Sequence, residues 1–175
     1  MTVLNAHKQG EFLVVRELLK HGASVYVPVV HAERIGAVVR RRDGRFIELQ
    51  VTTINTPKTP RWFQVSDLVS RPGFFVVGVT LATRPKEVWV IPSVVFSEYS
   101  SVSVGSGKAI FDLDLDSGAR KYGRPKRELL SEYQGAWDLL LDDDDDPTID
   151  EISAASMPSF AEDWNSPEDA AYDTV

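Results

Sequence analysis

Residues 35–53, IGAVVRRRDGRFIELQVTT, carry the local signals from which the fold can be inferred. Asp43 and Gly44 separate two runs of apolar and β-branched residues, 34–41 and 45–53, and an Asp-Gly pair between such runs indicates a hairpin turn. The second run alternates apolar and polar residues, which predicts a strand with one buried face. Its apolar face comprises Ile47, Leu49 and Val51, and its polar face comprises Glu48, Gln50 and Thr52.

A helix and a strand are predicted before this hairpin. In residues 9–21 the apolar residues recur at helical spacing, and Gly22 follows as a C-terminal stop. Residues 24–30 are rich in valine, which favours a strand. The helix face that we expect to be buried includes Phe12, Val15, Leu18 and Leu19.

The segments after the hairpin extend it into a mixed α/β domain. The near-continuous apolar runs 74–82 and 87–91 predict strands that are buried on both sides. We further expect a short helix over residues 92–99, a loop over 100–107, an edge strand over 110–115 and an amphipathic helix over 126–141. This order predicts one α/β domain over residues 1–141.

The charge is divided between this domain and a C-terminal tail. Residues 142–175 hold 12 acidic residues and no basic ones, which leaves 14 acidic against 19 basic residues in the domain. A run of like charges repels itself, so we expect the tail to be disordered in isolation. It could act as a solubilising tail, or it could dock on the basic domain or on a partner.

Several classes of protein are excluded by composition. The absence of cysteine excludes a disulfide scaffold, a thiolate zinc site and a cysteine nucleophile. The three histidines, His7, His21 and His31, lack the spacing of metal ligands. No apolar run is long enough to span a membrane, and the N-terminus has no signal-peptide pattern. We therefore expect a soluble, cytoplasmic protein.

Short motifs throughout the domain point to one family. They are GE at 10–11, ELLKHG at 17–22, VYVP at 25–28, IGAVVR at 35–40, LQVTT at 49–53, RWF at 61–63, VWVIP at 88–92 and the segment 133–140. In their order and spacing they resemble the PD-(D/E)XK nuclease superfamily, in particular small bacterial and archaeal members related to Holliday-junction resolvases. The resemblance implies a restriction-endonuclease-like fold, a mixed sheet flanked by helices with an α-β-β-β-α-β core, followed by a C-terminal helix and the disordered tail.

The resemblance also implies a site for metal-dependent cleavage of nucleic acid. In that superfamily an Asp opens the second strand, and a Glu or Gln stands two residues before a Lys on the third. These groups hold Mg²⁺ and the attacking water, and a glutamate of the first helix commonly assists. Glu11 and Gln50 match two of the positions, but Gly36 takes the place of the Asp and Thr52 the place of the Lys. We therefore expect a degenerate site and no cofactor.

Two carboxylates could replace the missing ligands. Glu33 lies three residues before Gly36, and Glu48 shares a strand face with Gln50. If either has been recruited, the protein is an active endonuclease that requires Mg²⁺. The alternative is that both are solvated charges at strand ends.

The domain and the tail suggest different partners. Basic residues around the hairpin and the loop after it could neutralise DNA phosphates, or they could be solvated surface charges. They are Arg40, Arg41, Arg42, Arg45, Lys58 and Arg61. Trp164 and Tyr172, flanked by acidic residues, resemble the tails of small bacterial antitoxins and suit docking on a basic groove. The leading hypothesis is a DNA-binding pseudo-nuclease with an autoinhibitory or partner-binding tail, and the alternative is an antitoxin or immunity module on a nuclease scaffold.

Overall fold

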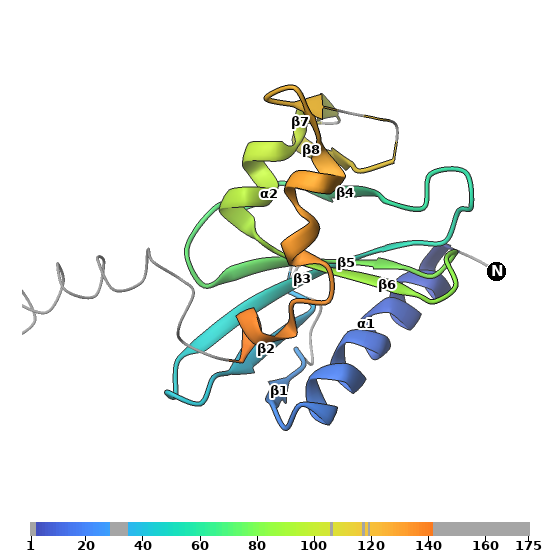
Figure 1. Ribbon diagram of the computed structural model, residues 1–175. Coiled ribbons are helices and arrows are strands. Elements are labelled where there is room, and N and C mark those ends of the chain that lie inside the picture. Colours follow the sequence, from blue (N-terminus) through green and yellow to red (C-terminus); the bar gives the residue numbers. More distant parts are fainter. Residues whose placement is uncertain (1–2, 29–34, 106, 117, 119, 142–175) are drawn as a thin grey trace, which may run out of the picture. The chain divides into compact units, whose positions relative to one another are not determined.

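The computed structural model in Figure 1 describes residues 3–28, 35–105, 107–116, 118 and 120–141. All of these residues belong to one structural unit, Met1–Asp143. The sequence predictions for Glu33, Trp164, Tyr172 and the acidic segment 142–175 therefore lie outside the described residues.

A mixed sheet of five strands forms the centre of this unit, in the order β1-β2-β3-β5-β6. The strands are β1 (Ser24–Tyr26), β2 (Ala37–Arg40), β3 (Phe46–Ile54), β5 (Phe74–Thr80) and β6 (Glu87–Pro92). Neighbouring strands are antiparallel except for β3 and β5, which are parallel with Glu48 opposite Phe74. The predicted β2–β3 hairpin is present, and Gly44 takes the left-handed conformation (φ 92°) that its turn requires.

A second, smaller sheet and several helices complete the fold. The small sheet has the order β4-β8-β7, formed by β4 (Trp62–Ser66), β8 (Lys108–Asp114) and β7 (Ser101–Gly105). The short strands β9 (Arg120–Lys121) and β10 (Arg124–Pro125) pair with each other. The helices are α1 (Val3–Lys20), α2 (Ser93–Tyr99) and α3 (Lys126–Leu129), followed by single 3₁₀ turns at Ser131–Tyr133 and Trp137–Leu140.

Helix α1 covers one face of the five-stranded sheet (Figure 1). Its buried stripe comprises Ala6, Gly10, Val14 and Leu18, whereas Phe12 and Leu19, which we expected to be buried, are exposed. The small residues face the sheet because the helix backbone approaches it closely. A Cβ atom at Gly10 would lie 1.9 Å from the Thr53 Oγ1 of β3. This close approach sets the rotation of the helix, and Phe12 and Leu19 are turned outward.

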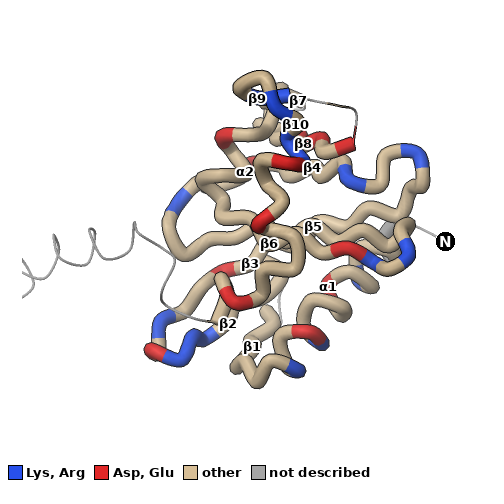
Figure 2. The backbone as a smooth tube through the Cα atoms, in the orientation of Figure 1, with Lys and Arg blue, Asp and Glu red and all other residues tan. Residues whose placement is uncertain are grey.

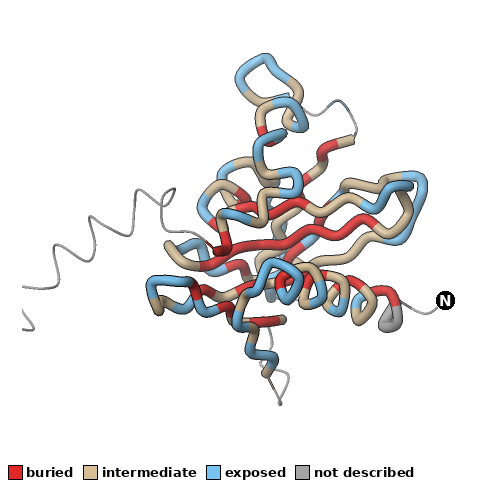
Figure 3. Tube along the Cα trace, turned by 60° about the horizontal axis from the view of Figure 1, so that its bottom comes forward, coloured by how far each residue is buried: buried red, intermediate tan, exposed pale blue. Residues whose placement is uncertain are grey.

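The described residues cover the opposite face of the sheet only in part. The small sheet and α2 pack on it through a second apolar core that includes Phe63, Trp89, Phe96 and Leu113. Strand β5 lies between the two cores and is buried at all seven positions, as its apolar run predicts (Figure 3). Gly78 gives room for the Phe63 ring, which would lie 2.7 Å from a Cβ atom there.

The secondary structure differs from the sequence predictions at four points. Residues 101–105, expected in a loop, form strand β7, and residues 108–114 form the central strand β8 rather than an edge strand. The predicted helix over 126–141 ends at Leu129, because the chain folds back onto β6 and the Gly135 N–H donates to the Val88 carbonyl. The connection between the parallel strands β3 and β5 contains strand β4 where the α-β-β-β-α-β order has a helix.

Candidate nucleic-acid interface

The uncovered part of the sheet is the face of β1, β2 and the first half of β3 that points away from α1. Alternation along these strands places Ala37, Val39, Ile47 and Leu49 in the core beneath α1. Their neighbours point to the other side and remain exposed or half-buried. We call this surface the open face; it comprises Tyr26, Val38, Arg40, Phe46 and Glu48.

The polar face predicted for β3 is confirmed, and its three residues have different surroundings. Glu48 forms an ion pair with Arg71 at 2.5 Å. Gln50 is half-buried, and its Oε1 atom is buried without a hydrogen-bond partner among the described residues. Thr52 donates through Oγ1 to the Gln64 carbonyl of β4 at 3.0 Å, so the small sheet lies against its side chain.

Glu11 and Gly36, the other two positions implied by the family resemblance, lie on the α1 side of the sheet. Glu11 lies on α1 itself, and its carboxylate contacts His7 at 3.0 Å and Lys8 at 2.6 Å on the same helix. A Cβ atom at Gly36 would lie 3.3 Å from the Cγ2 atom of Val51, which is a residue of the α1 core. The structure therefore brings Glu48 and Gln50 to one face and leaves Glu11 and Gly36 on the other.

The described residues do not fit a Mg²⁺ site of the kind that the resemblance implies. Mg²⁺ is held by carboxylate and other hard oxygen ligands. In the described part of the chain no three His, Cys, Asp or Glu side chains are grouped so that they could hold a metal ion. Near Gln50 the described carboxylate is that of Glu48, which is already paired with Arg71.

The basic residues predicted to bind phosphate fall into two groups rather than one. Arg40, Arg42 and Arg45 belong to the β2–β3 hairpin, whereas Lys58 and Arg61 follow the far end of β3 (Figure 2). Strand β3 has nine residues. At about 3.3 Å per residue, it separates the two groups by about 30 Å. Arg40, Arg42 and Lys58 are exposed, and Arg45 contacts Asp43 across the turn.

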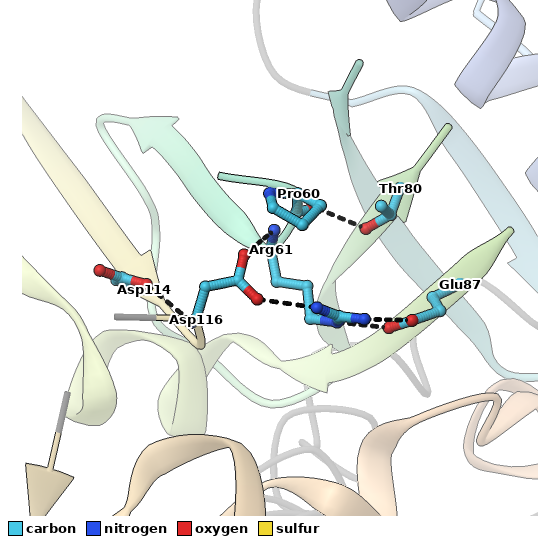
Figure 4. A network of polar contacts seen from close by, with 6 residues as sticks. All are labelled: Pro60, Arg61, Thr80, Glu87, Asp114 and Asp116. Atoms are coloured by element: carbon cyan, nitrogen blue, oxygen red, sulfur yellow. Dashed lines mark hydrogen bonds and ion pairs between the residues drawn. The ribbon is translucent and has the colours of Figure 1, made fainter. Parts of the chain in front are cut away.

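Two of the arginines predicted to bind phosphate instead make hydrogen bonds within the fold. Arg41 is buried and donates through Nη2 to the Leu139 carbonyl at 2.5 Å, which holds the C-terminal segment against the hairpin. Arg61 is 14% exposed and lies between Glu87 and Asp116 (Figure 4). Its Nε donates to Glu87 at 2.6 Å and its Nη1 to Asp116 at 2.7 Å, and its Nη2 also contacts Glu87.

The electrostatics of the Arg61 group explain why it is unsuited to bind phosphate. The hydrogen bonds from Arg61 hold the pKa of Glu87 below its usual value, although burial opposes this shift. The same bonds raise the pKa of the guanidinium itself. Two carboxylates thus compensate one cation that links the start of β4 to β6 and to the end of β8. The geometry does not favour Arg41 or Arg61 as phosphate contacts.

Sequence reasoning missed two aromatic residues on the open face. Tyr26 on β1 is 51% exposed and Phe46 on β3 is 59% exposed. Their ring centroids lie 5.8 Å apart with an interplanar angle of 60°, so the rings meet across β2. The sequence could have indicated Phe46, because the alternation along β3 places it on the same strand face as Glu48 and Gln50.

Comparison with solved structures gives information on the fold, whereas comparison of the sequence gives none. No family model and no curated protein matches the sequence. The solved structure of I-Ssp6803I, a bacterial homing endonuclease, is similar with a TM-score of 0.52 and 21% sequence identity, over 80% of this chain and 91% of that chain. The chain has a nuclease-like fold. This confirms the predicted fold class, a mixed α/β sheet with flanking helices.

None of the described helices is both long and apolar enough to cross a bilayer.

Proposed function

We propose that the chain binds nucleic acid through a PD-(D/E)XK-type scaffold and has lost the metal-dependent cleavage of that superfamily. The observation that carries the proposal is the open face of a nuclease-like sheet, bordered by exposed arginines and lacking a group of metal-ligating side chains among the described residues. The protein would be a pseudo-nuclease, in which the scaffold serves for binding.

The binding half of the proposal rests on charge. Residues 1–141 carry 19 basic against 14 acidic residues, and the β2–β3 hairpin holds four arginines against two acidic residues, Asp43 and Glu48. Arg40 and Arg42 are exposed, and each can neutralise a phosphate. Contacts of this kind fix position on the backbone and carry no sequence information.

The loss of cleavage rests on the replaced positions. An Asp in place of Gly36 would crowd Val51, since even a Cβ atom there lies within 3.3 Å of its Cγ2. At the position of the superfamily Lys, the Thr52 hydroxyl is bonded to the Gln64 carbonyl and offers no positive charge to a water molecule. Glu11 contacts two residues of its own helix. Two positions of the standard site are thus replaced and Glu11 is engaged elsewhere, which leaves Gln50 without the other groups of the site.

The acidic segment 142–175 supplies regulation in this proposal. Its 12 acidic residues compete with phosphates for the basic domain, so removing the segment should tighten nucleic-acid binding. If Trp164 and Tyr172 instead recruit a protein, the truncated chain should bind nucleic acid unchanged and lose that protein in an affinity capture. The second result would favour the antitoxin or immunity alternative.

The proposal is tested by fluorescence anisotropy with a labelled duplex over a range of salt concentrations. We expect binding that weakens steeply with salt, and a fall of about 1 to 2 in the slope of log K against log salt for Arg40→Ala/Arg42→Ala. The matched control is Arg84→Ala/Lys86→Ala, which removes two exposed cations from the opposite end of the sheet. Equal losses in both variants would show that binding is not centred on the hairpin, and no binding by the unmodified protein would refute the proposal.

A further inference from the structure

The open face carries two large aromatic side chains that the fold does not use. Phe63, Trp89 and Phe96 are fully buried in the second core, whereas Phe12, Trp62 and Tyr122 are exposed at separate places outside the open face. Tyr26 and Phe46 instead present more than half of their surface to solvent, on the two strands that flank β2. Exposed apolar surface of this kind marks a binding site more often than it serves stability.

We infer that Tyr26 and Phe46 form a platform on which unpaired bases stack, so that the open face binds single-stranded nucleic acid in preference to duplex. This inference rests on the proposed function and names its substrate class. Proteins that bind single strands combine aromatic rings, which stack on bases, with cations that neutralise the adjoining phosphates.

The second element of such a site, positive charge next to the rings, is also present. In the register of β2 and β3, Arg40 lies directly opposite Phe46, and in that of β1 and β2 it lies opposite Ser24, two residues from Tyr26. Directly paired residues of an antiparallel sheet have their Cα atoms about 4.5 to 5.5 Å apart. The exposed Arg40 is therefore placed to reach the phosphate of a nucleotide whose base lies on Phe46.

The shape of the site favours a single strand over a duplex. The major groove of B-DNA is about 12 Å wide and admits a helix or a two-stranded ribbon. The open face spans the three strands β1, β2 and β3, and its rings lie on the two outer strands. In a duplex the bases are stacked on one another, and their flat surfaces cannot reach such a platform.

Charge argues against a second copy of this chain as the occupant. A two-fold axis that passes next to Arg40 would bring the two copies of this guanidinium together. Nucleic acid has the opposite charge and supplies flat apolar rings, so it matches both features of the surface.

The test uses the full chain and fluorescein-labelled oligothymidylate, with a duplex of equal length and an oligouridylate as further probes. We expect Tyr26→Ala and Phe46→Ala each to weaken single-strand binding by about 5- to 150-fold, the range for loss of one stacked base. Duplex binding should change by less than about twofold, because it depends on phosphate contacts. The control is Phe12→Ala, which removes an exposed aromatic ring from α1 on the other side of the sheet.

Conservative variants separate stacking from apolar burial. Tyr26→Phe keeps the ring and should retain binding, whereas Phe46→Leu keeps an apolar side chain and should lose it. As a direct readout, ultraviolet irradiation with an oligonucleotide that contains 5-iododeoxyuridine should crosslink to the peptides that contain Tyr26 or Phe46. Comparison of the oligouridylate with an oligodeoxyuridylate, which carries the same base, then identifies which sugar the site accepts.

The possible failures can be distinguished. If the unmodified protein binds neither single strands nor duplex, both the proposed function and this inference are wrong. If it binds duplex and single strands equally and the alanine variants bind like the unmodified protein, only the aromatic platform is refuted. A loss in Phe12→Ala as large as that in Phe46→Ala would also overturn it.

Discussion

Replacing Arg61 with methionine tests whether the Arg61–Glu87–Asp116 group links the two sheets, as its geometry indicates. The substitution retains much of the length of the side chain and removes its charge. It abolishes three side-chain hydrogen bonds, two to Glu87 and one to Asp116. Both carboxylates then remain in place without their cation.

The expected loss follows from the burial of the three groups. Removing one partner of a buried ion pair costs about 3 to 5 kcal/mol, because the other charge is left uncompensated. Glu87 and Asp116 remain 13% and 19% exposed, so water recovers part of their solvation. We therefore expect Arg61→Met to lower the free energy of unfolding by about 2 to 4 kcal/mol near neutral pH.

The pH dependence of this loss has a defined sign. Arg61 depresses the pKa of Glu87. A depressed carboxyl pKa stabilises the fold above the unfolded value of about 4.3, and this contribution is lost as the pH falls through the folded value. Arg61→Met removes the largest cause of this depression, while burial continues to act in the opposite direction on the pKa of Glu87. The difference between the two proteins should be largest near neutral pH and should shrink below about pH 4.

Urea denaturation followed by circular dichroism measures both effects, at about pH 7 and about pH 3.5. The control is Arg124→Met, since Arg124 and Glu128 form an exposed pair at 59% and 57% exposure. It should cost at most about 0.5 kcal/mol. Adding Glu87→Gln to Arg61→Met should restore part of the stability by removing the uncompensated charge. The reasoning is refuted if Arg61→Met costs no more than the control, or if its cost does not change with pH.

Three further substitutions test the packing and the electrostatics of the sheet. Gly10→Ala should lower the free energy of unfolding, measured with urea, by about 1 to 3 kcal/mol, although alanine has the higher helix propensity. The reason is that its Cβ atom would lie 1.9 Å from the Thr53 Oγ1 atom. Adding Thr53→Ala should recover part of this loss. Gly78→Ala should have a similar cost, because its Cβ atom would lie 2.7 Å from the Phe63 ring. Unchanged stability would contradict the packing described. Glu48→Gln should release Arg71 and strengthen nucleic-acid binding about two- to fivefold in anisotropy; weaker binding would contradict the account.

The part of the fold that the sequence predicted is the part set by local signals. The turn at Asp43-Gly44 and the alternation of β3 depend on adjacent residues, and both appear as expected. Strand β5 was predicted as doubly buried because its residues are all apolar or small. The role of β8 was missed because pairing on both sides is decided by β4 and β7, which come from other segments of the chain. Its Asp112 accepts a hydrogen bond from Gln64 of β4, a partner that no local pattern identifies.

The candidate site was predictable to a similar extent. Alternation placed Glu48, Gln50 and Thr52 on one face, and the structure agrees. Alternation could not show which face of the sheet is covered by the helix that carries Glu11. The partners of Arg61 lie 26 and 55 residues further along the chain, so its involvement in folding depends on contacts that only the tertiary structure reveals.

The central claim, that the scaffold binds nucleic acid and has lost metal-dependent cleavage, is tested most directly by a cleavage time course. The full chain is incubated with labelled branched, duplex and single-stranded DNA in Mg²⁺ or Mn²⁺ and in chelator, while anisotropy records binding under the same conditions. The account predicts that the protein binds DNA and that the strands remain intact with either ion. Cleavage that requires the metal and disappears with chelator would contradict it, and Glu33→Gln and Glu48→Gln would then identify which carboxylate has replaced the missing ligand.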